Sequence, residues 1–481
     1  MNIMVIRIEK IQKILGVLLF AMLSTSCQDW LDVSPETEVK YDDLFSYKNG
    51  FKDQLTGCYT AMCTEGLYGA HLTFGMMDAL GQQYTWQQEA GTYYHLHRFE
   101  YDNSTSEGVI SGVWSDLYNV IANINILLQG LNEHGDVLTP QEKNIYKGEA
   151  LALRAFLHFD LLRMFGKSYV SGANKDAIPY VKEILKEVPP LKTVSEVCDL
   201  AINDLKEAAS LLDEDPIKTG EATTVFLGTR SFHFNYYAVR ALMARIYLYK
   251  NDKANALENA LEIIESNKFP WVNRANVVTG SRDSRDGIFL TECIFMLNNT
   301  KLKSLTETFL KESENNTTGN LLVMDQDVVT DIFEAEKYGG TDWRYTYYFD
   351  LLASYYYGST KLFQVSSAYN NRQPLLRMSE MYLIAAECAS SKKDALAYLN
   401  TLRQHRGFDV SNDLTEESVS DDMLQDLIGK EYRKEFVGEG QWFFYCKRTD
   451  QASLPNVKVP FSKDYYVLPI PDAELEYGNR N

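Results

Sequence analysis

Two apolar stretches joined by a very short turn place the strongest constraint on how this chain can fold. They occupy residues 235–266 and are separated only by the polar segment KNDK. Two helices joined by so short a turn must pack side by side and antiparallel. Ala244 and Ala256 lie twelve residues apart, like the small residues where two helices approach in a tetratricopeptide repeat, and Tyr247 falls on that motif's tyrosine position. The pattern predicts a helical hairpin over 233–267.

The same plan recurs further along the chain, in the segment 375–407. Its residues Ala385 and Ala397 are again twelve apart. Apolar residues at three- and four-residue steps predict further long helices over 113–131 and 144–165. Repeated helix pairs of this kind indicate a helical-repeat scaffold.

Three single residues refine this prediction. Gly166 is placed to stop the second long helix, and Thr193 with Glu196 has the spacing of a capping box, which predicts that another helix begins there. Asn125 falls on the apolar stripe of the first long helix. A buried amide is stable only when it is hydrogen-bonded, so we expect Asn125 to have partners.

The fold class that follows is mainly α, a tetratricopeptide-like helical-repeat scaffold with long irregular loops and a few short strands. No Pro/Gly/Ser linker divides the chain, so we predict a single body over 27–481, with an N-terminal region at 27–215, the hairpin at 233–267 and a C-terminal region at 268–481. Long segments between the predicted helices are more often functional than idle. These segments are 64–110, 167–192, 213–232 and 268–372.

The N-terminal segment has the layout of a secretory signal. Basic residues precede an apolar run at 14–23, which is ten residues long, whereas a membrane span needs about 20. Cys27 follows three small hydroxyl residues directly, and this arrangement resembles a bacterial lipobox. We therefore expect residues 1–26 to be removed and Cys27 to be lipidated, which anchors the chain to a membrane without crossing it. The alternative is an ordinary cleaved signal with an incidental cysteine.

Charge and cysteine content exclude several classes of partner. Removal of residues 1–26 takes the formal net charge from −19 to −21, which argues against a nucleic-acid partner because such a chain repels phosphates. Six further cysteines are too sparse for a disulfide framework and lack zinc-site spacing. His95 and His97 would face the same side of a strand, but no other metal ligand is fixed near them. We expect no structural disulfide, no metal and no cofactor.

Aromatic side chains give the main indication of binding. The chain contains 31 Tyr, 23 Phe and 6 Trp, and flat side chains with a polar edge stack on the apolar faces of sugar rings at low entropic cost. In the segment 81–99 aromatic residues alternate with glutamines that can bind hydroxyl groups. We predict ligand binding by Tyr84, Trp86, Gln87 and Tyr93. The alternative for Trp86 is a core anchor beneath the loop.

A second aromatic cluster lies in the sequence DWRYTYYFDLLASYYYG at 342–358. Neighbouring residues of an extended segment point to opposite faces, so the three tyrosines at 355–357 cannot all be buried and at least one should be exposed. We predict Trp343, Tyr347 and Tyr356 as ligand-binding residues.

Catalytic motifs are scarce in this sequence. It contains no G-x-S-x-G, no H-E-x-x-H and no glycine-rich phosphate loop. The segment KEYRKEFVGE offers Glu431, Glu435 and Glu439 as an acid/base site, but Arg433 and Lys434 on the same helix make ion pairing the better interpretation. We therefore predict a binding protein with no catalytic residues, and keep a surface glycosidase as a third hypothesis, because the spacing of paired carboxylates is spatial.

Seven stretches together resemble the SusD/RagB family of nutrient-uptake outer-membrane lipoproteins, in the family's order. They are CQDWLDVSP, LYNVIANINILL, GEALALRAFLHFDLLRMFG, YAVRALMARIYLYKND, PLLRMSEMYLIAAEC, IGKEYRKEFVGEGQWFFYCKR and YYVLPIPDAELEYGN. The likeness runs from Cys27 to Asn481. It departs from the family after Gly440, where Gln441 and the pair Tyr445-Cys446 replace an arginine and an Asp-Leu pair, which puts the local salt bridges in doubt.

The resemblance implies a lipid-anchored protein on the extracellular face of the outer membrane. Its partner in the family is a SusC-like TonB-dependent transporter, over which it sits as a hinged lid and to which it delivers oligosaccharides or, in some members, peptides. The family has no catalytic activity. An Asp-x-Arg segment near Trp343 and Arg344 looks like a scaffold feature of the family, which is the alternative to a ligand role for these two residues. Peptide capture is the alternative to oligosaccharide capture.

Overall fold

The computed structural model describes residues 41–86, 88–184, 188–312, 319–352, 355–363 and 366–478. The chain divides into two units, of which the first ends at Tyr47 and contributes the short helix α2 (Tyr41–Phe45). All other described elements belong to the second unit, which begins at Lys48. The segment 1–26 and Cys27 lie outside the described residues, so the lipidation of Cys27 stays a prediction.

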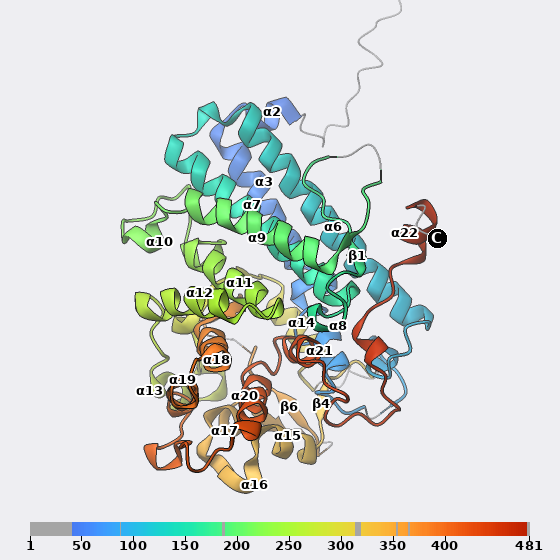
Figure 1. Cartoon of the computed structure of the whole chain (residues 1–481), viewed down its shortest axis with the longest axis vertical. Coiled ribbons are helices and arrows are strands. Elements are labelled where there is room, and N and C mark those ends of the chain that lie inside the picture. The colour runs from blue at the N-terminus through green and yellow to red at the C-terminus, as the bar shows by residue number, and fades with distance from the viewer. Residues whose placement is uncertain are drawn as a thin grey trace, which may run out of the picture. The chain divides into compact units, whose positions relative to one another are not determined.

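Four long helices form the N-terminal part of the second unit (Figure 1). They are α3 (Lys48–Met62), α6 (Ser104–Glu133), α7 (Pro140–Phe165) and α9 (Val194–Leu211). The helices predicted over 113–131 and 144–165 are confirmed as parts of α6 and α7. Because α7 packs against both α6 and α9, it is buried on nearly every side. This explains why apolar residues occur on nearly all sides of the helix, interrupted by a few charged side chains such as Arg154 and Arg163.

The predicted helix ends are confirmed in two places. The Thr193 side chain accepts a hydrogen bond from the backbone N–H of Glu196, and the Glu196 carboxylate accepts one from Thr193, so α9 begins with a capping box. Helix α7 ends at Phe165, and Gly166 continues in an extended conformation with φ −92° and ψ 162°. Gly166 thus stops the helix, but without the left-handed turn that a glycine at this position often adopts.

Asn125 is buried and hydrogen-bonded at both atoms of its amide, as its place on the apolar stripe requires. Its Nδ2 donates to the carbonyl of Val181 at 3.1 Å, and its Oδ1 accepts from Nη1 of Arg154 at 3.1 Å. Arg154 in turn forms a two-bond ion pair with Asp204 at 2.8 and 2.9 Å. One amide therefore links α6 to α7, and through Arg154 to α9.

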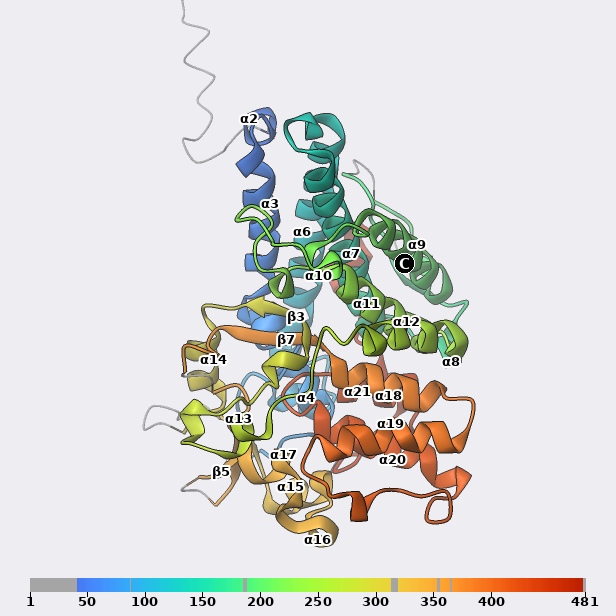
Figure 2. The ribbon, with the colours of Figure 1, turned by 90° about the vertical axis from the view of Figure 1, so that its left-hand side faces the viewer.

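Five stacked helices form the middle of the second unit (Figure 2). They are α11 (Tyr236–Tyr249), α12 (Lys253–Ser266), α18 (Met378–Cys388), α19 (Lys392–Gln404) and α20 (Asp421–Glu435). Helix α12 contacts α11 on one side and α18 on the other, and α18 contacts α19. The predicted hairpin and the mainly α, tetratricopeptide-like scaffold are confirmed. Among the described helices, none combines the length and the apolar character that crossing a membrane requires.

The twelve-residue alanine spacing holds in the first helix pair and fails in the second. Ala244, Ala256 and Ala385 are completely buried, but Ala397 is exposed. Helix α19 instead turns Ala395 toward the core, together with Leu396, Leu399 and Leu402. The buried face of α19 is thus shifted by about half a turn from the face that the repeat pattern predicted.

Short helices occupy much of the sequence that we expected to be irregular. They are η2 (Glu65–Gly69), α4 (Met76–Leu80), α5 (Tyr94–His97), η3 (Gly135–Val137), α8 (Tyr169–Gly172), α10 (Pro216–Thr219), η4 (Arg230–Phe232), α13 (Arg274–Val278), η5 (Arg282–Ser284), η6 (Leu290–Glu292), α14 (Leu302–Phe309), α15 (Gln326–Phe333), α16 (Ala335–Tyr338), η7 (Gly339–Thr341), α17 (Trp343–Tyr347), η8 (Val410–Asn412), α21 (Trp442–Arg448), η9 (Lys463–Tyr466) and α22 (Asp472–Tyr477). Most are one or two turns long, which is too short to show a periodic pattern in sequence.

The described strands are few and short, as predicted, and all pair antiparallel. Strand β1 (Asp176–Ile178) pairs with β2 (Lys192–Thr193), and β3 (Cys293–Asn298) pairs with β7 (Arg372–Arg377). A third sheet has the order β4-β6-β5, formed by β4 (Val323–Met324), β6 (Tyr357–Ser359) and β5 (Phe349–Leu351).

The predicted strand at His95 and His97 is wrong, because these residues form the short helix α5. His95 Nδ1 is hydrogen-bonded to Glu100 at 2.6 Å, and the ring of His97 stacks on Trp86. The two imidazoles therefore have separate local partners. No group of three or more potential metal ligands occurs among the described residues.

Acid should destabilise this fold between about pH 4.5 and pH 2. Burial alone would raise the pKa of Glu149, but Arg230 and His233 outweigh it and lower this pKa to about 2. Burial would likewise raise the pKa of Glu431, but the positive charges of Lys434 and Arg344 outweigh it and lower this pKa to about 2 as well. Since the unfolded carboxyls titrate near pH 4.3, the unfolded state binds more protons within this window, and stability falls as the pH falls.

The check is the urea midpoint measured across this pH range. We expect a monotonic decrease amounting to a few kcal/mol in the free energy of unfolding, and a shallower decrease for Glu149→Gln, which removes one of the titrating carboxyls. An unchanged midpoint between about pH 4.5 and pH 2 would contradict this prediction.

Candidate ligand-binding surface

The small β4-β6-β5 sheet brings the two aromatic segments of the sequence together. Val323 of β4 pairs with Gly358 of β6 and also with Thr85, whose N–H donates to the Val323 carbonyl at 2.8 Å. Trp86, which follows Thr85, therefore lies past one end of the paired residues, and Tyr356, which precedes β6, lies past the other end. Strand spacing and rise place their backbones roughly 14 Å apart. We call the surface formed by the described residues 84–86, 88–92, 349–352 and 355–357 the aromatic surface.

Trp86 is half-buried and held flat against His97. Their ring centroids lie 4.5 Å apart at an interplanar angle of 24°, and Tyr84 meets the indole edge-on at 6.3 Å. Burial lowers the pKa of His97 to about 4, so the imidazole beneath the indole is uncharged at neutral pH. The support fixes the orientation of the Trp86 ring and leaves part of it exposed, which is what a stacking residue needs.

Tyr84 and Tyr93 belong to the core, so our assignment of these two rings to a ligand-stacking surface is corrected. They are 4% and 1% exposed, respectively. The Tyr84 hydroxyl donates to the carbonyl of Phe74 at 2.7 Å, and the Tyr93 hydroxyl is hydrogen-bonded to Nδ1 of His71 at 2.9 Å. Tyr84 therefore supports the edge of Trp86, whereas Tyr93 packs against His71 and Phe309 in the core.

The glutamines around Trp86 also include both buried and exposed residues. Gln82 is buried and donates to the carbonyl of His97 at 2.7 Å, and Gln83 is buried and accepts from Nε of Arg433 at 3.1 Å. Gln88 is exposed. Gln87 lies outside the described residues, so its role as a ligand contact stays a prediction.

Two glycines hold the Trp86 loop against the segment that precedes β4. A Cβ on Gly319, whose φ is +72°, would lie 2.7 Å from the carbonyl oxygen of Ala90, and one on Gly91 would lie 2.4 Å from the carbonyl oxygen of Gly319. The adjacent Thr92 N–H donates to Oδ1 of Asn320 at 2.8 Å. Backbone therefore packs directly on backbone here, which only glycine permits at both positions.

Gly319→Ala should displace the Trp86 loop, since the new methyl group must push Ala90 away and a positive φ disfavours alanine. We expect faster proteolytic cleavage within 84–92 and a loss of about 1–2 kcal/mol in the free energy of unfolding. Gly339→Ala is the matched control: its φ is +55°, but a Cβ there meets nothing within 4 Å. Equal cleavage rates in the two variants would contradict the proposed backbone contact.

Trp343 and Tyr347 are partly buried and pack against one cluster of core residues. That cluster consists of Val272, Val277, Phe289 and Tyr348. The Trp343 N–H donates to the carbonyl of Arg406 at 2.8 Å, and a Cβ on Gly407 would lie 2.4 Å from the indole. Tyr347 lies beneath the guanidinium of Arg285 at 4.9 Å. Packing accounts for the position of Trp343, and a ligand role for either residue stays a prediction.

The tip of the β5–β6 hairpin carries exposed apolar side chains that the sequence singled out only in part. Tyr355 is 84% exposed with φ +64°, and Leu351 is 60% exposed. Tyr356 and Tyr357 are half-buried, so the prediction that at least one of the three tyrosines is exposed is confirmed. A positive φ is costly for a bulky residue, and residues that keep such strain cluster at functional sites. Tyr355 is therefore a ligand candidate that the sequence did not single out.

The carboxylates Glu431, Glu435 and Glu439 are fully committed to a buried ion-pair network. Arg344 bonds Glu431 and Glu435 at 2.8 and 2.9 Å, and Arg377 bonds Glu435 and Glu439 at 2.5 and 2.7 Å. The ion-pairing interpretation is confirmed for Glu431 with Lys434 at 3.0 Å, but it is wrong for Arg433, which bonds Asp331 instead. The other partners of these glutamates come from distant segments. The scaffold alternative for Arg344 holds as well, because this side chain is buried among three carboxylates, Asp342 included.

Two family models match separate parts of this chain. One, described as starch-binding associating with outer membrane, matches residues 29–248, and the other, described as the SusD family, matches residues 298–454. Together they cover most of the chain, including both halves of the aromatic surface.

Curated sequences agree with these matches. SusD-like protein P38 of Formosa agariphila is 25% identical over 276 residues, and SusD-like protein P25 of the same organism is 20% identical over 279. The chain spans about half the length of these curated relatives, 46% in each case.

The structural neighbours cover more of both chains. A SusD superfamily protein from Bacteroides vulgatus has a TM-score of 0.71 at 24% identity, covering 90% of this chain and 98% of its own. A SusD-like carbohydrate binding protein from the same organism has a TM-score of 0.70 at 20% identity, covering 90% and 97%. These likenesses establish the fold.

Proposed function

Because this chain belongs to the SusD/RagB family, we propose that it captures oligosaccharides at the outer membrane through the aromatic surface. The observation that carries the proposal is Trp86, a partly exposed indole held flat by a neutral His97. An aromatic ring offered to solvent in a fixed orientation is a platform for the apolar face of a sugar ring, and its rigidity limits the entropy lost on binding.

The exposed ring of Tyr355 extends this platform to the far end of the same sheet. Since Trp86 and the Tyr355–Tyr357 segment flank one short sheet, a linear chain of several sugar units could contact both. Tyr356 and Tyr347 remain candidates for hydrogen bonds and stacking along its path, as does Gln87. Their contribution is part of this proposal.

We propose binding without catalysis. Glycoside hydrolysis requires two carboxyl groups that flank the scissile bond, and the three most suggestive glutamates of the sequence are neutralised by arginine and lysine. Cargo would then pass to a SusC-like TonB-dependent transporter, with lipidated Cys27 as the anchor on the extracellular face of the outer membrane. The family matches support this partner and location.

Isothermal titration of the soluble form, with Cys27 and the preceding residues removed, against a panel of polysaccharides tests the proposal. We expect heat of binding with at least one neutral glycan, and no release of reducing ends during long incubation. Binding to peptides with no heat from any glycan would favour peptide capture and overturn the proposal. Release of reducing ends would instead identify a glycosidase.

A further inference from the structure

A large cleft lies apart from the aromatic surface and shares no residue with it. Its volume is about 780 Å³, and its walls come from the start of α6, the end of α7 and the C-terminal segment 464–473. The segment is fixed on both sides: the Tyr101 hydroxyl donates to the carbonyl of Tyr465 at 2.6 Å, and the Leu468 N–H donates to the carbonyl of Met164 at 3.0 Å. The cleft is therefore a preformed feature of the fold.

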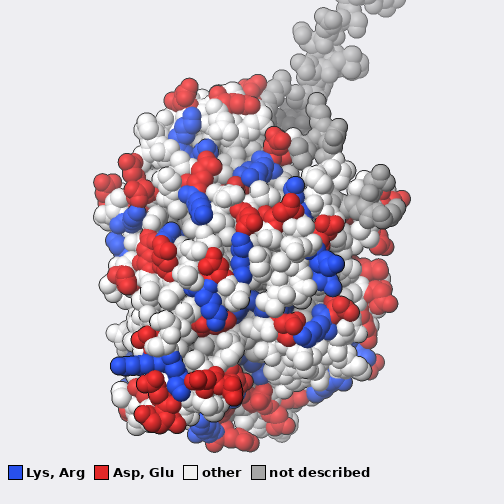
Figure 3. Space-filling view, viewed as in Figure 1, with Lys and Arg blue, Asp and Glu red and all other residues white. Residues whose placement is uncertain are grey.

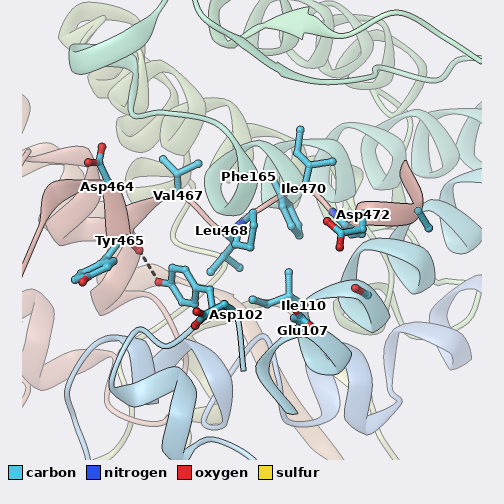
Figure 4. Close-up of a pocket in the computed structure, with 15 residues that line it drawn as sticks. Asp102, Glu107, Ile110, Phe165, Asp464, Tyr465, Val467, Leu468, Ile470 and Asp472 are labelled. Carbon is cyan, nitrogen blue, oxygen red and sulfur yellow. Dashed lines mark hydrogen bonds between the residues drawn. The ribbon is translucent and has the colours of Figure 1, made fainter. Parts of the chain in front are cut away.

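Apolar side chains form the middle of this cleft and carboxylates form its edge. Figure 4 shows Val467, Leu468, Ile470 and Phe165 at the centre. Exposed carboxylates surround them: Asp464 and Asp472 at the two ends, and Asp102 and Glu107 along one side. An apolar centre favours burial of apolar side chains from a partner.

The charge of the cleft is one-sided. None of its fifteen lining residues is basic, and among the described residues none of the four carboxylates forms an ion pair. On the face shown in Figure 3, by contrast, acidic and basic side chains are interspersed. Four uncompensated carboxylates create a negative potential at the cleft, which attracts cations and repels phosphate-bearing surfaces.

The adjacent surface of α6 allows close approach of another backbone. Gly108 and Gly112 are one helical turn apart and flank the lining residue Ser111, and a Cβ at either position would meet nothing within 4 Å. The chain's own packing thus gives no reason for glycine here, although each glycine costs a helix roughly 0.5–1 kcal/mol relative to alanine.

We propose that this cleft docks a polypeptide segment of a partner protein in which apolar side chains are flanked by lysine or arginine. The apolar side chains would fill the centre, the cations would pair with the four carboxylates, and the glycine surface of α6 would accommodate the partner's backbone. This proposal does not depend on glycan binding, because the two surfaces share no residue.

A fluorescent peptide that alternates lysine with leucine provides the probe, and fluorescence anisotropy the readout. We expect the combined substitutions Asp102→Asn and Glu107→Gln to weaken binding by about 5- to 10-fold, and Ile470→Ser to weaken it as well. The control combines Glu416→Gln with Asp422→Asn, which removes the same charge from exposed sites outside the cleft. It should leave affinity unchanged.

Three outcomes would overturn the docking proposal. The first is equal weakening in the control variant and in the cleft variant (Asp102→Asn with Glu107→Gln), which would reflect net charge alone. The second is equal binding of a peptide with glutamate in place of lysine. The third is unchanged affinity in both Ile470→Ser and the cleft variant. Glycan titration of the cleft variant should match the parent protein and so keeps this test separate from that of the aromatic surface.

Discussion

Replacing Glu435 by alanine is expected to lower the free energy of unfolding by about 3–5 kcal/mol, the cost of breaking a buried ion pair from one side. Glu435 is 1% exposed and accepts hydrogen bonds from Arg344, Arg377 and Arg406 at 2.5 to 2.9 Å. Burial opposes ionisation, but Arg406 and Arg377 hold the pKa of Glu435 well below its ordinary value. Without this carboxylate, Arg344, Arg377 and Arg406 each lose one buried anionic partner, and each keeps only its other carboxylates, Asp342 and Glu431, Glu439, and Glu292, respectively.

The measurement is equilibrium unfolding in urea, compared with Glu416→Ala. Glu416 is exposed on a loop, so the same substitution there should change stability by no more than about 0.5 kcal/mol. Glu435→Gln keeps the shape of the side chain and removes only its charge. We expect it to lower the free energy of unfolding by a large part of the decrease caused by Glu435→Ala. If Glu435→Ala proved as stable as Glu416→Ala, the network would contribute nothing to this fold.

The network also links the scaffold to the aromatic surface. Besides Glu435 of α20, it includes Arg377 at the end of β7 and Arg344 in α17, directly before β5. Lys361, which follows β6, bonds the carbonyls of Glu435 and Val437 at 2.9 and 3.0 Å. Strands β5 and β6 are therefore fastened at both outer ends to α20, so the β5–β6 hairpin projects from a rigid base.

The sequence predicted the long helices because their pattern is local and repeated. Seven residues of α6 recur at helical spacing, and Thr193 with Glu196 marks a helix start, so each element can be recognised without knowing its neighbours. The prediction from Ala385 and Ala397 was wrong at Ala397, because a twelve-residue spacing does not show which face of a helix is buried. Which of Ala395 and Ala397 faces the core is decided by packing against α18 and α20, and a single helix does not encode that choice.

The candidate site was harder to predict because aromatic composition does not distinguish a platform from its support. Trp86, Tyr84 and Tyr93 look alike in sequence, yet Trp86 is partly exposed and the two tyrosines are buried. The pairing of Thr85 with Val323 joins residues 238 positions apart, and no local signal specifies it. Tyr355 could have been singled out only by its backbone strain, which requires the structure.

Trp86→Ala is expected to reduce glycan affinity by about 10- to 100-fold, since it removes an apolar contact of roughly 1.5–3 kcal/mol. The same change should cost the fold no more than about 1–2 kcal/mol, because the indole is only half-buried and its main contact is the stack on His97. Trp86→Phe should retain part of the affinity, because it keeps a flat ring. We would measure the affinity of each variant by titration with the glycan of the panel that binds most tightly, and its free energy of unfolding in urea.

Trp271 offers a closely matched control for this experiment. It is also half-buried and also stacks on a histidine, His405, with centroids 4.5 Å apart at 13°, but it lies against α18 and outside the aromatic surface. Trp271→Ala should therefore cost a similar amount of stability and leave glycan affinity unchanged. Equal losses of glycan affinity in the two alanine variants would show that the effect comes from general destabilisation. A large loss in the free energy of unfolding that is confined to Trp86→Ala would show that this indole is a core anchor. Only a loss of affinity specific to Trp86 is compatible with a binding platform, because Trp271 is supported by a histidine in the same way but lies outside the aromatic surface.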